Sequence, residues 1–435
     1  LYYMRALAKD LIGEYGGPGE GFTVFEPGDK LTFKVKQGRY YVDGILCENG
    51  ADLSCALPQG DPISSALYLV YLDVWERLVT ALDDEAIREV ALRGADTATR
   101  AQVVWQVKVT NKMPDDSPIG GSRETDWVKW LTEDLDKDTD KATGLTEGHK
   151  RNRWNSWVAH WQGDDRGRLK AGVGDGGDPN ANPCTTPPTA GYRGAENQLY
   201  RVEIHRGGAA ADGPATFKWS RDNGSVALPL AALAWPLATL ARAARDERLG
   251  LHVGDWVELV NDDLALAGAA GPLAQVEATD PDELTVTLDA PAGVAWPSFT
   301  ADECQAKHVQ LRRWDHQASI ESATGGALPV QEGQWLALED GVQVWFEAPP
   351  PAKKEPIEQQ AGQAHHYRAG DYWLIPARTA TGDVEWPGPS GAPEFALPHG
   401  VAHHYAPLAI VGVLNNTCVV LQSFHRCIEI VPTLG

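Results

Sequence analysis

The chain has 435 residues, which is too many for one ordinary hydrophobic core and predicts several domains. Its 60 acidic and 38 basic residues give a formal net charge of −22, and no basic patch is present that could bind a phosphate backbone. No segment reaches about 18 uninterrupted apolar residues, the length that a membrane-spanning helix needs. We therefore expect a globular protein with no nucleic-acid partner and no membrane span.

The first predicted element is a short helix within residues 1–21. Met4, Leu7 and Leu11 recur at helical spacing there, and a Gly-Gly-Pro run ends the pattern. Because the chain starts at Leu1 without a methionine or a signal-peptide pattern, we expect it to begin inside a longer gene product.

Residues 22–110 are predicted to form a first β domain. In GRYYVDGILCENG, strand-like residues flank Asp43 and Gly44, a pair that favours a hairpin turn. SALYLVYLDVWERLVT predicts a long strand. AQVVWQVKVT alternates, so that Trp105 and Val107 fall on one face of a further strand.

Residues 111–190 are predicted to be an irregular, tryptophan-rich insertion that packs on this first domain. Asp, Gly, Pro and Asn cluster there, as is typical of loops. Trp154, Trp157, Val158 and Trp161 fit one face of a helix within it.

Residues 191–247 are predicted to be a β hairpin region that contains the stretch TFKWSRDNGSVALP. Phe217 and Trp219 are at alternating positions of an incoming strand. Asn223 and Gly224 both accept positive φ, so the pair predicts a hairpin turn after that strand.

The same stretch also suggests a catalytic serine. Ser220 lies beside Arg221 and close to Asp222, but no G-x-S-x-G turn occurs anywhere in the chain. We therefore interpret these polar residues as turn chemistry and predict no catalytic residue and no cofactor.

Residues 248–299 are predicted to form a small β-barrel module, and residues 300–435 a C-terminal β-rich domain. HVGDWVELV and AQVEATDPDELTVTLDAP supply the short strands of the barrel. The predicted fold is mainly β and multi-domain. It consists of antiparallel sandwich or barrel modules, a short N-terminal helix and the tryptophan-rich insertion.

Two groups of residues have metal-ligand spacing. Asp136, Asp138, Asp140 and Glu147 match positions 1, 3, 5 and 12 of a calcium-binding loop, but Lys141 stands where that loop needs glycine.

The second group is His399, His403 and His404. Two of these are four residues apart, as zinc ligands on a helix are, but the neighbouring Pro398, Gly400 and Pro407 disfavour a helix. We predict no bound metal at either group.

The six cysteines contain no CxxC pair, which excludes a zinc ribbon. Cys47 with Cys55, and Cys418 with Cys427, are spaced so that disulfides are permitted but not required. Sixty acidic residues and 16 tryptophans also leave open a glycan-binding or glycan-degrading protein that acts on cell-surface glycans.

Several long segments resemble a bacterial family of unknown function whose members accompany contractile phage-tail-like injection systems. These segments are GRYYVDGILCEN, YLDVWERLVTALDDEAIREVAL, DTATRAQVVWQVKV, ENQLYRVEIH, TFKWSRDNGSV, VGDWVELV and GDYWLIPARTATGDVEWP. The piece YVDGILCEN is also similar to N-terminal modules of phage tail-fibre and baseplate proteins.

The resemblance extends from Leu1 to about Ile410. It implies a structural or adaptor component with a baseplate, fibre or surface-attachment role. Its partners would be other copies of itself and further particle proteins, in a particle that is cytoplasmic or released outside the cell. It supplies no catalytic residues.

Overall fold

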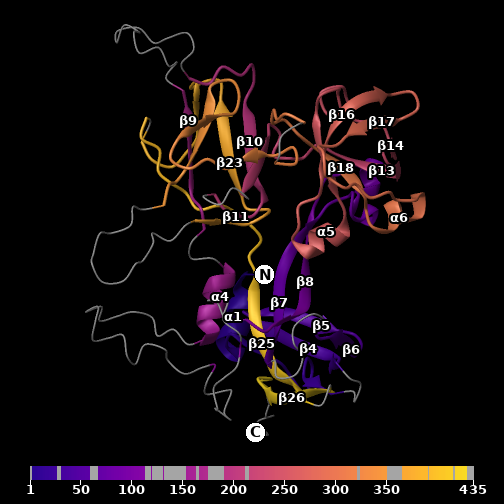
Figure 1. The fold of residues 1–435 in the computed structure, drawn as a ribbon, viewed down its shortest axis with the longest axis vertical. Coiled ribbons are helices and arrows are strands. Elements are labelled where there is room, and N and C mark those ends of the chain that lie inside the picture. The colour runs from indigo at the N-terminus through magenta and orange to yellow at the C-terminus, as the bar shows by residue number, and fades with distance from the viewer. Residues whose placement is uncertain are drawn as a thin grey trace. The chain divides into compact units, whose positions relative to one another are not determined.

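The computed structural model describes residues 2–26, 31–58, 67–112, 119, 131, 153–162, 166–174, 191–210, 215–320, 324–349, 365–389, 391–414 and 417–428. The protein is mainly β with short helices, so the predicted fold class is confirmed (Figure 1). The chain forms two compact units. Leu1–Asp164 and Val401–Gly435 make the first, and Asp165–Gly400 make the second.

Within the described residues, the first unit contains three antiparallel sheets, in the strand orders β1-β4-β5, β2-β3-β6 and β26-β25-β7-β8. Its elements are α1 (Tyr2–Ile12), β1 (Tyr15–Gly16), β2 (Val24–Phe25), β3 (Thr32–Val35), β4 (Gly38–Val42), β5 (Ile45–Asn49), β6 (Leu53–Ala56), β7 (Leu67–Val79), the 3-10 helices η1 (Glu85–Ile87) and η2 (Val90–Leu92), β8 (Arg100–Thr110), α4 (Arg153–Gln162), β25 (His404–Leu414) and β26 (Thr417–Ser423).

The long strand β7 is the centre of the first unit. Its sequence LYLVYLDVW is apolar at almost every position, and the residues from Tyr68 to Trp75 are buried, as is typical of a strand that is covered on both faces. On one side β7 pairs with β8, and on the other with β25, from His404 opposite Val74 to Gly412 opposite Leu67.

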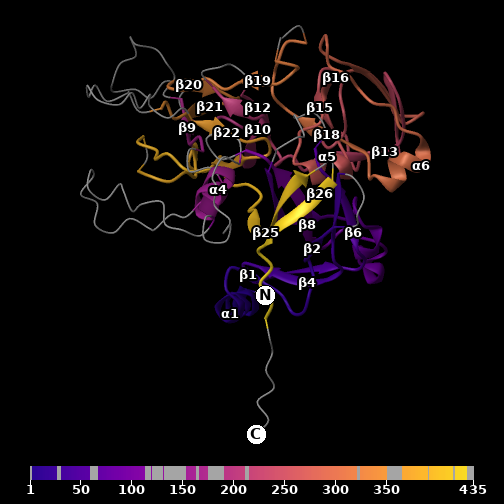
Figure 2. The same ribbon diagram turned by 60° about the horizontal axis from the view of Figure 1, so that its bottom comes forward.

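This pairing divides the chain differently from the prediction. Because β25 completes the sheet of β7, residues 401–435 belong to the first unit, whereas the rest of the predicted 300–435 domain belongs to the second. Figure 2 shows the C-terminal strands β25 and β26 in yellow; β7 lies between β25 and β8 in the same sheet.

The hairpin predicted at Asp43 and Gly44 is confirmed. Val42 of β4 pairs with Ile45 of β5, and the two turn residues have φ of 48° and 79°. Positive φ at both central residues matches the right-handed twist of the flanking strands. This turn lies beneath α1, because a Cβ at Gly44 would lie 2.1 Å from the Arg5 carbonyl oxygen.

The predicted 111–190 insertion does not form one piece. The helix expected from its tryptophans is present as α4, and Trp154 and Trp157 are buried in the first unit with Tyr71. In contrast, residues 169–173 form a strand that pairs with residues 342–346 of the second unit.

The second unit contains a five-stranded sheet, β19-β12-β10-β23-β24, a three-stranded sheet, β20-β21-β9, a strand pair, β11-β22, and a closed barrel. Its elements are β9 (Leu169–Val173), β10 (Gln198–Arg206), β11 (Gly208–Ala209), β12 (Thr216–Ser220), β13 (Ala227–Ala234), β14 (Leu237–Leu240), β15 (Trp256–Val260), α5 (Asp262–Ala267), β16 (Leu273–Asp280), β17 (Thr285–Asp289), α6 (Ala301–Ala306), β18 (Gln310–Trp314), β19 (Leu328–Pro329), β20 (Trp335–Ala337), β21 (Val342–Phe346), β22 (His366–Tyr367), β23 (Tyr372–Arg378) and β24 (Asp383–Val384).

The barrel has the strand order β13-β14-β17-β16-β15-β18 and is antiparallel throughout. Alternate residues of its strands, such as Val257, Leu259 and Leu311, fill the interior. The sequence located the barrel at 248–299. Its closure also requires β13, β14 and β18, which lie outside those bounds.

The turn at Asn223 and Gly224 is present, with φ of 55° and 63°, but the predicted hairpin is wrong. β12, before the turn, pairs with β10 and β19, whereas β13, after it, pairs with β14 and β18. The turn therefore passes the chain from the five-stranded sheet into the barrel. The residues of the turn determine where the chain changes direction, but they do not determine which strands pair.

The five cysteines within the described residues are free thiols. In that part of the chain, no helix has both the length and the apolar character to cross a bilayer.

Candidate functional site: an arginine–carboxylate cavity

A cavity of about 350 Å³ lies in the second unit, at the low end of the size range of small-molecule sites. Its wall comes from the segment before β10, the turn after β12, the loop before β15, the end of β18 and the turn after β20. The lining residues are Tyr192, Gly194, Ala195, Glu196, Gln198, Tyr200, Arg221, Asp222, Arg248, His252, Asp255, Arg313, Asp315, Glu339 and Asp340.

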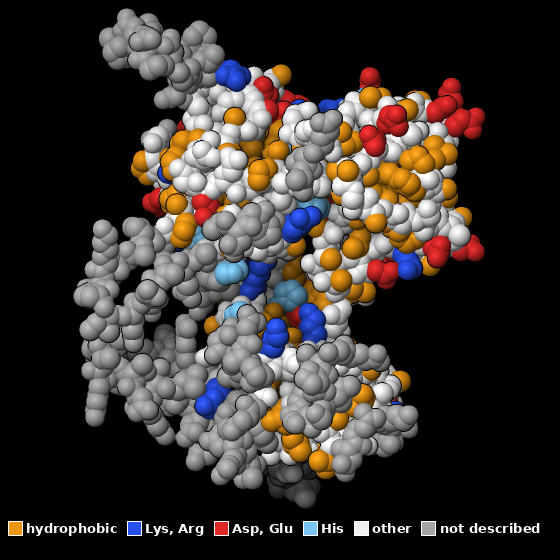
Figure 3. Space-filling model, in the orientation of Figure 1, with side chains coloured by type: hydrophobic (Ala, Val, Ile, Leu, Met, Phe, Trp, Pro, Cys, Tyr) orange, Lys and Arg blue, Asp and Glu red, His pale blue; other side chains and the backbone are white. Residues whose placement is uncertain are grey.

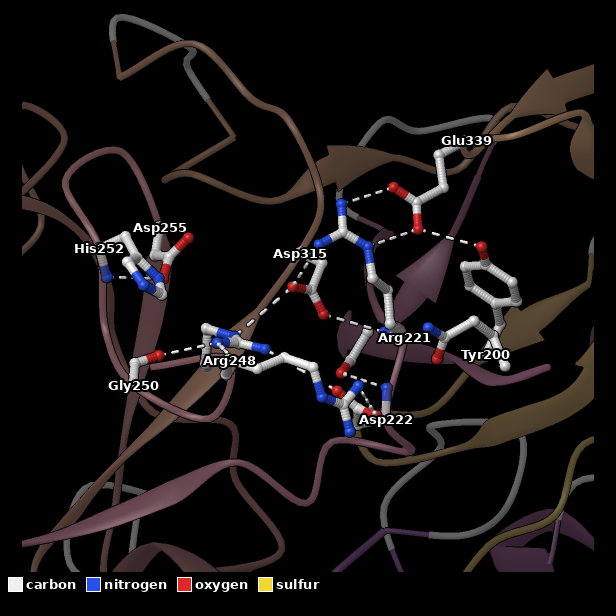
Figure 4. Close-up of polar contacts among 12 residues, drawn as sticks. Tyr200, Arg221, Asp222, Arg248, Gly250, His252, Asp255, Asp315 and Glu339 are labelled. Atoms are coloured by element: carbon white, nitrogen blue, oxygen red, sulfur yellow. Dashed lines mark hydrogen bonds and ion pairs between the residues drawn. The ribbon is translucent and has the colours of Figure 1, made fainter. Parts of the chain in front are cut away.

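Arg221 stands at the centre of the polar contacts (Figure 4). The turn after β12 positions it so that its Nε and Nη2 each donate to Glu339 at 2.6 Å, a bidentate pair. Its backbone N–H donates to Asp315 at 2.9 Å, and the Tyr200 hydroxyl donates to Glu339 at 3.0 Å. The bond to Glu339 raises the pKa of Arg221 above its ordinary value.

Arg313 also lines the cavity and is almost fully buried. Its Nη1 donates to the carbonyl oxygens of Arg248 and Gly250, at 2.8 and 2.7 Å. Its guanidinium also lies 3.5 Å from Asp315 and 3.8 Å from Asp222. Arg313 thus fixes the loop before β15 to the end of β18.

Arg248, whose side chain is 58% exposed, also lines the cavity. Its Nη1 lies 3.3 Å from Asp222 and 3.4 Å from Glu196. Nearby, the backbone N–H of His252 donates to Asp255 at 2.8 Å.

All three arginines of the cavity are therefore bound by carboxylates of the same chain. The described residues that line it include no serine, threonine or cysteine that could act as a nucleophile. Ser220, the sequence-level candidate, is 1% exposed, and its hydroxyl accepts the backbone N–H of Asp222 at 3.4 Å. This contact lies at the start of the turn after β12.

A second charged cluster is buried between β12 and the barrel strands. Lys218 is 0% exposed, and its Nζ lies 2.6 Å from Glu258 and 3.3 Å from Glu203. The indole of Trp314 donates to Glu258 at 2.9 Å, and its ring lies 4.5 Å from the Lys218 Nζ. Burial alone would raise the pKa of Glu258. Lys218, with weaker contributions from His205 and Arg312, more than offsets this and holds the pKa below its ordinary value.

Two histidines near this cluster are held neutral. Burial, with the charge of Lys218 added to it, lowers the pKa of His205 to about 3. Burial likewise lowers the pKa of His316 to about 4, although its ring is hydrogen bonded to the Gly326 carbonyl at 2.7 Å. The ring of His316 stacks on Trp256. The cluster therefore joins the five-stranded sheet to the barrel by packing and ion pairing.

The structure does not bring the histidine candidates together. His399 lies beside Tyr372 in the second unit, whereas His403 and His404 belong to the first. The Nδ1 of His403 lies 2.7 Å from Asp73, and that of His404 lies 2.9 Å from Asp43.

Among the described residues, no group of three or more His, Cys, Asp or Glu side chains is arranged to hold a metal ion. The acidic candidates Asp136, Asp138, Asp140 and Glu147 lie outside the described residues.

The sequence missed most of the residues that make these two clusters. Glu258, Arg313 and Glu339 come from segments far apart in the chain and have no shared motif. One local signal was present, because Lys218 stands between Phe217 and Trp219 in a strand, and a buried lysine requires a charged partner.

Comparison with curated proteins and with solved structures gave no match. One family model matches residues 1–144 and 165–433, and these ranges include every residue of the cavity and of the Lys218 cluster. The chain therefore belongs to that family, which is described as a family of unknown function (DUF6519).

Proposed function

We propose that the protein is a structural or adaptor component of a contractile phage-tail-like particle. The observation that carries this proposal is the surface of α1. Tyr3, Met4, Leu7 and Leu11 of this helix are 84%, 69%, 53% and 75% exposed. Adjacent apolar side chains at such exposure are a liability in a free monomer and mark a surface that another molecule covers.

The cavity supports the same proposal. Its three arginines are bound by internal carboxylates, so its charges join loops of the chain to one another. The described charged residues of the cavity therefore stabilise the second unit through internal ion pairs. The assignment to a phage-tail-like particle follows the sequence resemblance, and the assembly role follows the exposed helix.

The test is to express a tagged chain in its native source, sediment large particles and image them by electron microscopy. We expect the tagged chain to sediment with contractile, tail-like particles. Recovery of the chain solely as a free monomer would contradict the proposal. Sedimentation with particles of another shape would keep the assembly role and remove the phage-tail assignment.

A second candidate function, glycan binding, is favoured by one feature of the barrel. Trp235, in the turn between β13 and β14, is 38% exposed and stacks on Trp296 with ring centroids 5.3 Å apart. Figure 3 shows hydrophobic side chains gathered over the barrel between acidic side chains at its rim. An exposed aromatic face of this kind suits a sugar ring. Quenching of tryptophan fluorescence by surface polysaccharide, and its loss in Trp235→Ala, would support this function.

A further inference from the structure

Helix α1 is attached to the first unit through its charged face. Arg5 donates from Nη1 and Nη2 to Glu76 of β7 at 2.8 and 2.6 Å. One turn later, the Lys9 Nζ lies 2.6 Å from Asp43 of the β4–β5 turn. These residues, four apart, lie on one face of the helix. The polar face of α1 is thus turned toward the protein.

The apolar face of α1 is consequently turned toward solvent. Tyr3, Leu7 and Leu11 are spaced four residues apart and form a stripe, which Met4 widens. No residue of α1 is buried. This is the reverse of an ordinary surface helix, whose apolar face packs on the core. Figure 2 shows α1 beside β1 in the first unit.

The charge around this stripe specifies the chemistry of what covers it. Both basic residues of α1 are engaged on the inner face, and the remaining charge of the helix is Asp10, which is exposed beside Leu7 and Leu11. Glu14, just beyond the helix, is also exposed, and the chain carries a net charge of −22. A complementary surface is therefore apolar at its centre and basic at its edge.

We infer that the apolar stripe of α1 docks an amphipathic segment of another protein chain, with apolar side chains flanked by lysine or arginine. This inference rests on the proposed assembly role and names the class of partner. Tyr2 and Tyr3, both exposed, present ring faces on which arginine can stack. The four-residue spacing of the stripe matches a helix laid along α1.

Two other occupants fit the observations less well. A second copy of this chain brings a further charge of −22 and has the same acidic edge. A helix that lies on a membrane keeps its basic residues free for the lipid headgroups, but here Arg5 and Lys9 are paired with Glu76 and Asp43 of the same chain.

The test measures binding of two synthetic helical peptides to the full chain by fluorescence anisotropy. Both peptides have the same leucine face, and the flanking positions are lysine in one and glutamate in the other. We expect the lysine-flanked peptide to bind about tenfold more tightly or better, and its binding to weaken as salt rises. Equal binding of both peptides, or binding of neither, would overturn the inference.

Variants locate the binding on α1. Leu7→Ser with Leu11→Ser is expected to weaken binding about tenfold or more, and Tyr3→Ser with Met4→Ser provides an independent pair. Leu78→Ser is the matched control, because Leu78 is a 66% exposed leucine of β7 in the same unit. Asp10→Lys with Glu14→Lys is expected to reverse the preference between the peptides. Equal loss in the control, or an unchanged preference after charge reversal, would contradict the inference.

The remaining outcomes separate the alternatives. If the chain dimerises, loses its dimerisation in Leu7→Ser with Leu11→Ser and shows no preference between the peptides, the stripe mediates self-association and the inference is wrong. Binding to phosphatidylcholine vesicles through the same residues, again without a preference, would replace it with a lipid surface. If the tagged chain sediments with particles but shows no peptide preference, the proposed function stands and the partner class is wrong.

Discussion

At the scale of single residues, Gly224 has a backbone conformation that a β-branched residue adopts only with strain. Its φ is 63°, and a Cβ there would lie 3.4 Å from the Arg201 side chain, an ordinary contact. We expect Gly224→Val to lower the free energy of unfolding by about 1–3 kcal/mol through backbone strain. Gly224→Asn is the control and should cost less, because asparagine tolerates positive φ. An unchanged urea denaturation curve for the valine variant would refute this account of the turn.

Lys218 is the main ion-pair partner of the buried Glu258, whereas Glu203 is also paired with Arg201, so the loss of Lys218 leaves the charge of Glu258 uncompensated. We expect Lys218→Met to destabilise the protein by about 3–5 kcal/mol in urea denaturation. Without Lys218 the pKa of Glu258 rises, and the variant regains stability as the pH falls and the carboxyl becomes protonated. Lys218→Met with Glu258→Gln should recover part of the loss at neutral pH. A double variant no more stable than the single one would count against the ion pair.

The buried histidines predict a loss of stability in acid. His316 has a pKa of about 4 in the folded protein and near 6.5 when unfolded. The unfolded chain therefore takes up a proton between these values and the folded chain does not, so the free energy of unfolding falls as the pH drops from 6.5 to 4. In His316→Phe the fall over this window should be smaller. An identical slope of the free energy of unfolding against pH in both proteins would show that His316 does not cause the loss of stability in acid.

Residue chemistry in the sequence predicted local conformation better than it predicted burial. Asp43 and Gly44, with Asn223 and Gly224, set positive φ through their own side chains or the lack of one. Lys218 follows an alternating pattern that normally leaves one strand face in solvent. Here the barrel strands carrying Glu258 and Trp314 cover that face, and only the folded chain brings them there.

At the scale of elements, two ion pairs attach α1 to the first unit. Arg5 and Glu76 are partly exposed, so the pair contributes up to about 1 kcal/mol. We expect Arg5→Ala to speed amide hydrogen exchange in residues 2–12 and to change global stability by less than about 1 kcal/mol. Arg39→Ala removes an exposed ion pair with Glu48 and should leave exchange in α1 unchanged. Unchanged α1 exchange in Arg5→Ala would show that other contacts attach the helix.

Elements with a strong internal period were predictable, whereas their partners were not. The helix around Trp154 follows from its apolar spacing, and the strand of residues 67–79 follows from its continuous apolar run. The barrel was located only in part, because its strands at 227–240 and 310–314 are separated in sequence from the strands they join. The orientation of α1 was also unpredicted, because apolar residues at helical spacing indicate a helix but not the direction in which its apolar face is turned.

At the scale of the whole molecule, the second unit is one continuous segment, Asp165–Gly400, placed within the chain of the first. All strands of its sheets and of its barrel come from this segment. We expect a protein of residues 165–400 to fold alone, with a cooperative urea transition and near-ultraviolet circular dichroism. Residues 1–164 lack β25 and should remain poorly folded. A folded 1–164 fragment, or an unfolded 165–400 fragment, would refute this division of the chain.

The position of β25 between β7 and β26 also has a consequence during translation. The ribosome releases β7 early, but the neighbouring strand follows only after residues 165–400 have been made. About 325 residues lie between the end of β7 at Val79 and the start of β25 at His404, so at about 5–20 residues per second that interval is on the order of 15 to 65 s. Throughout it, one edge of β7 in the nascent chain lacks the strand that finally pairs with it. Nascent-chain chaperones are therefore most needed for the half of the sheet that is synthesised first.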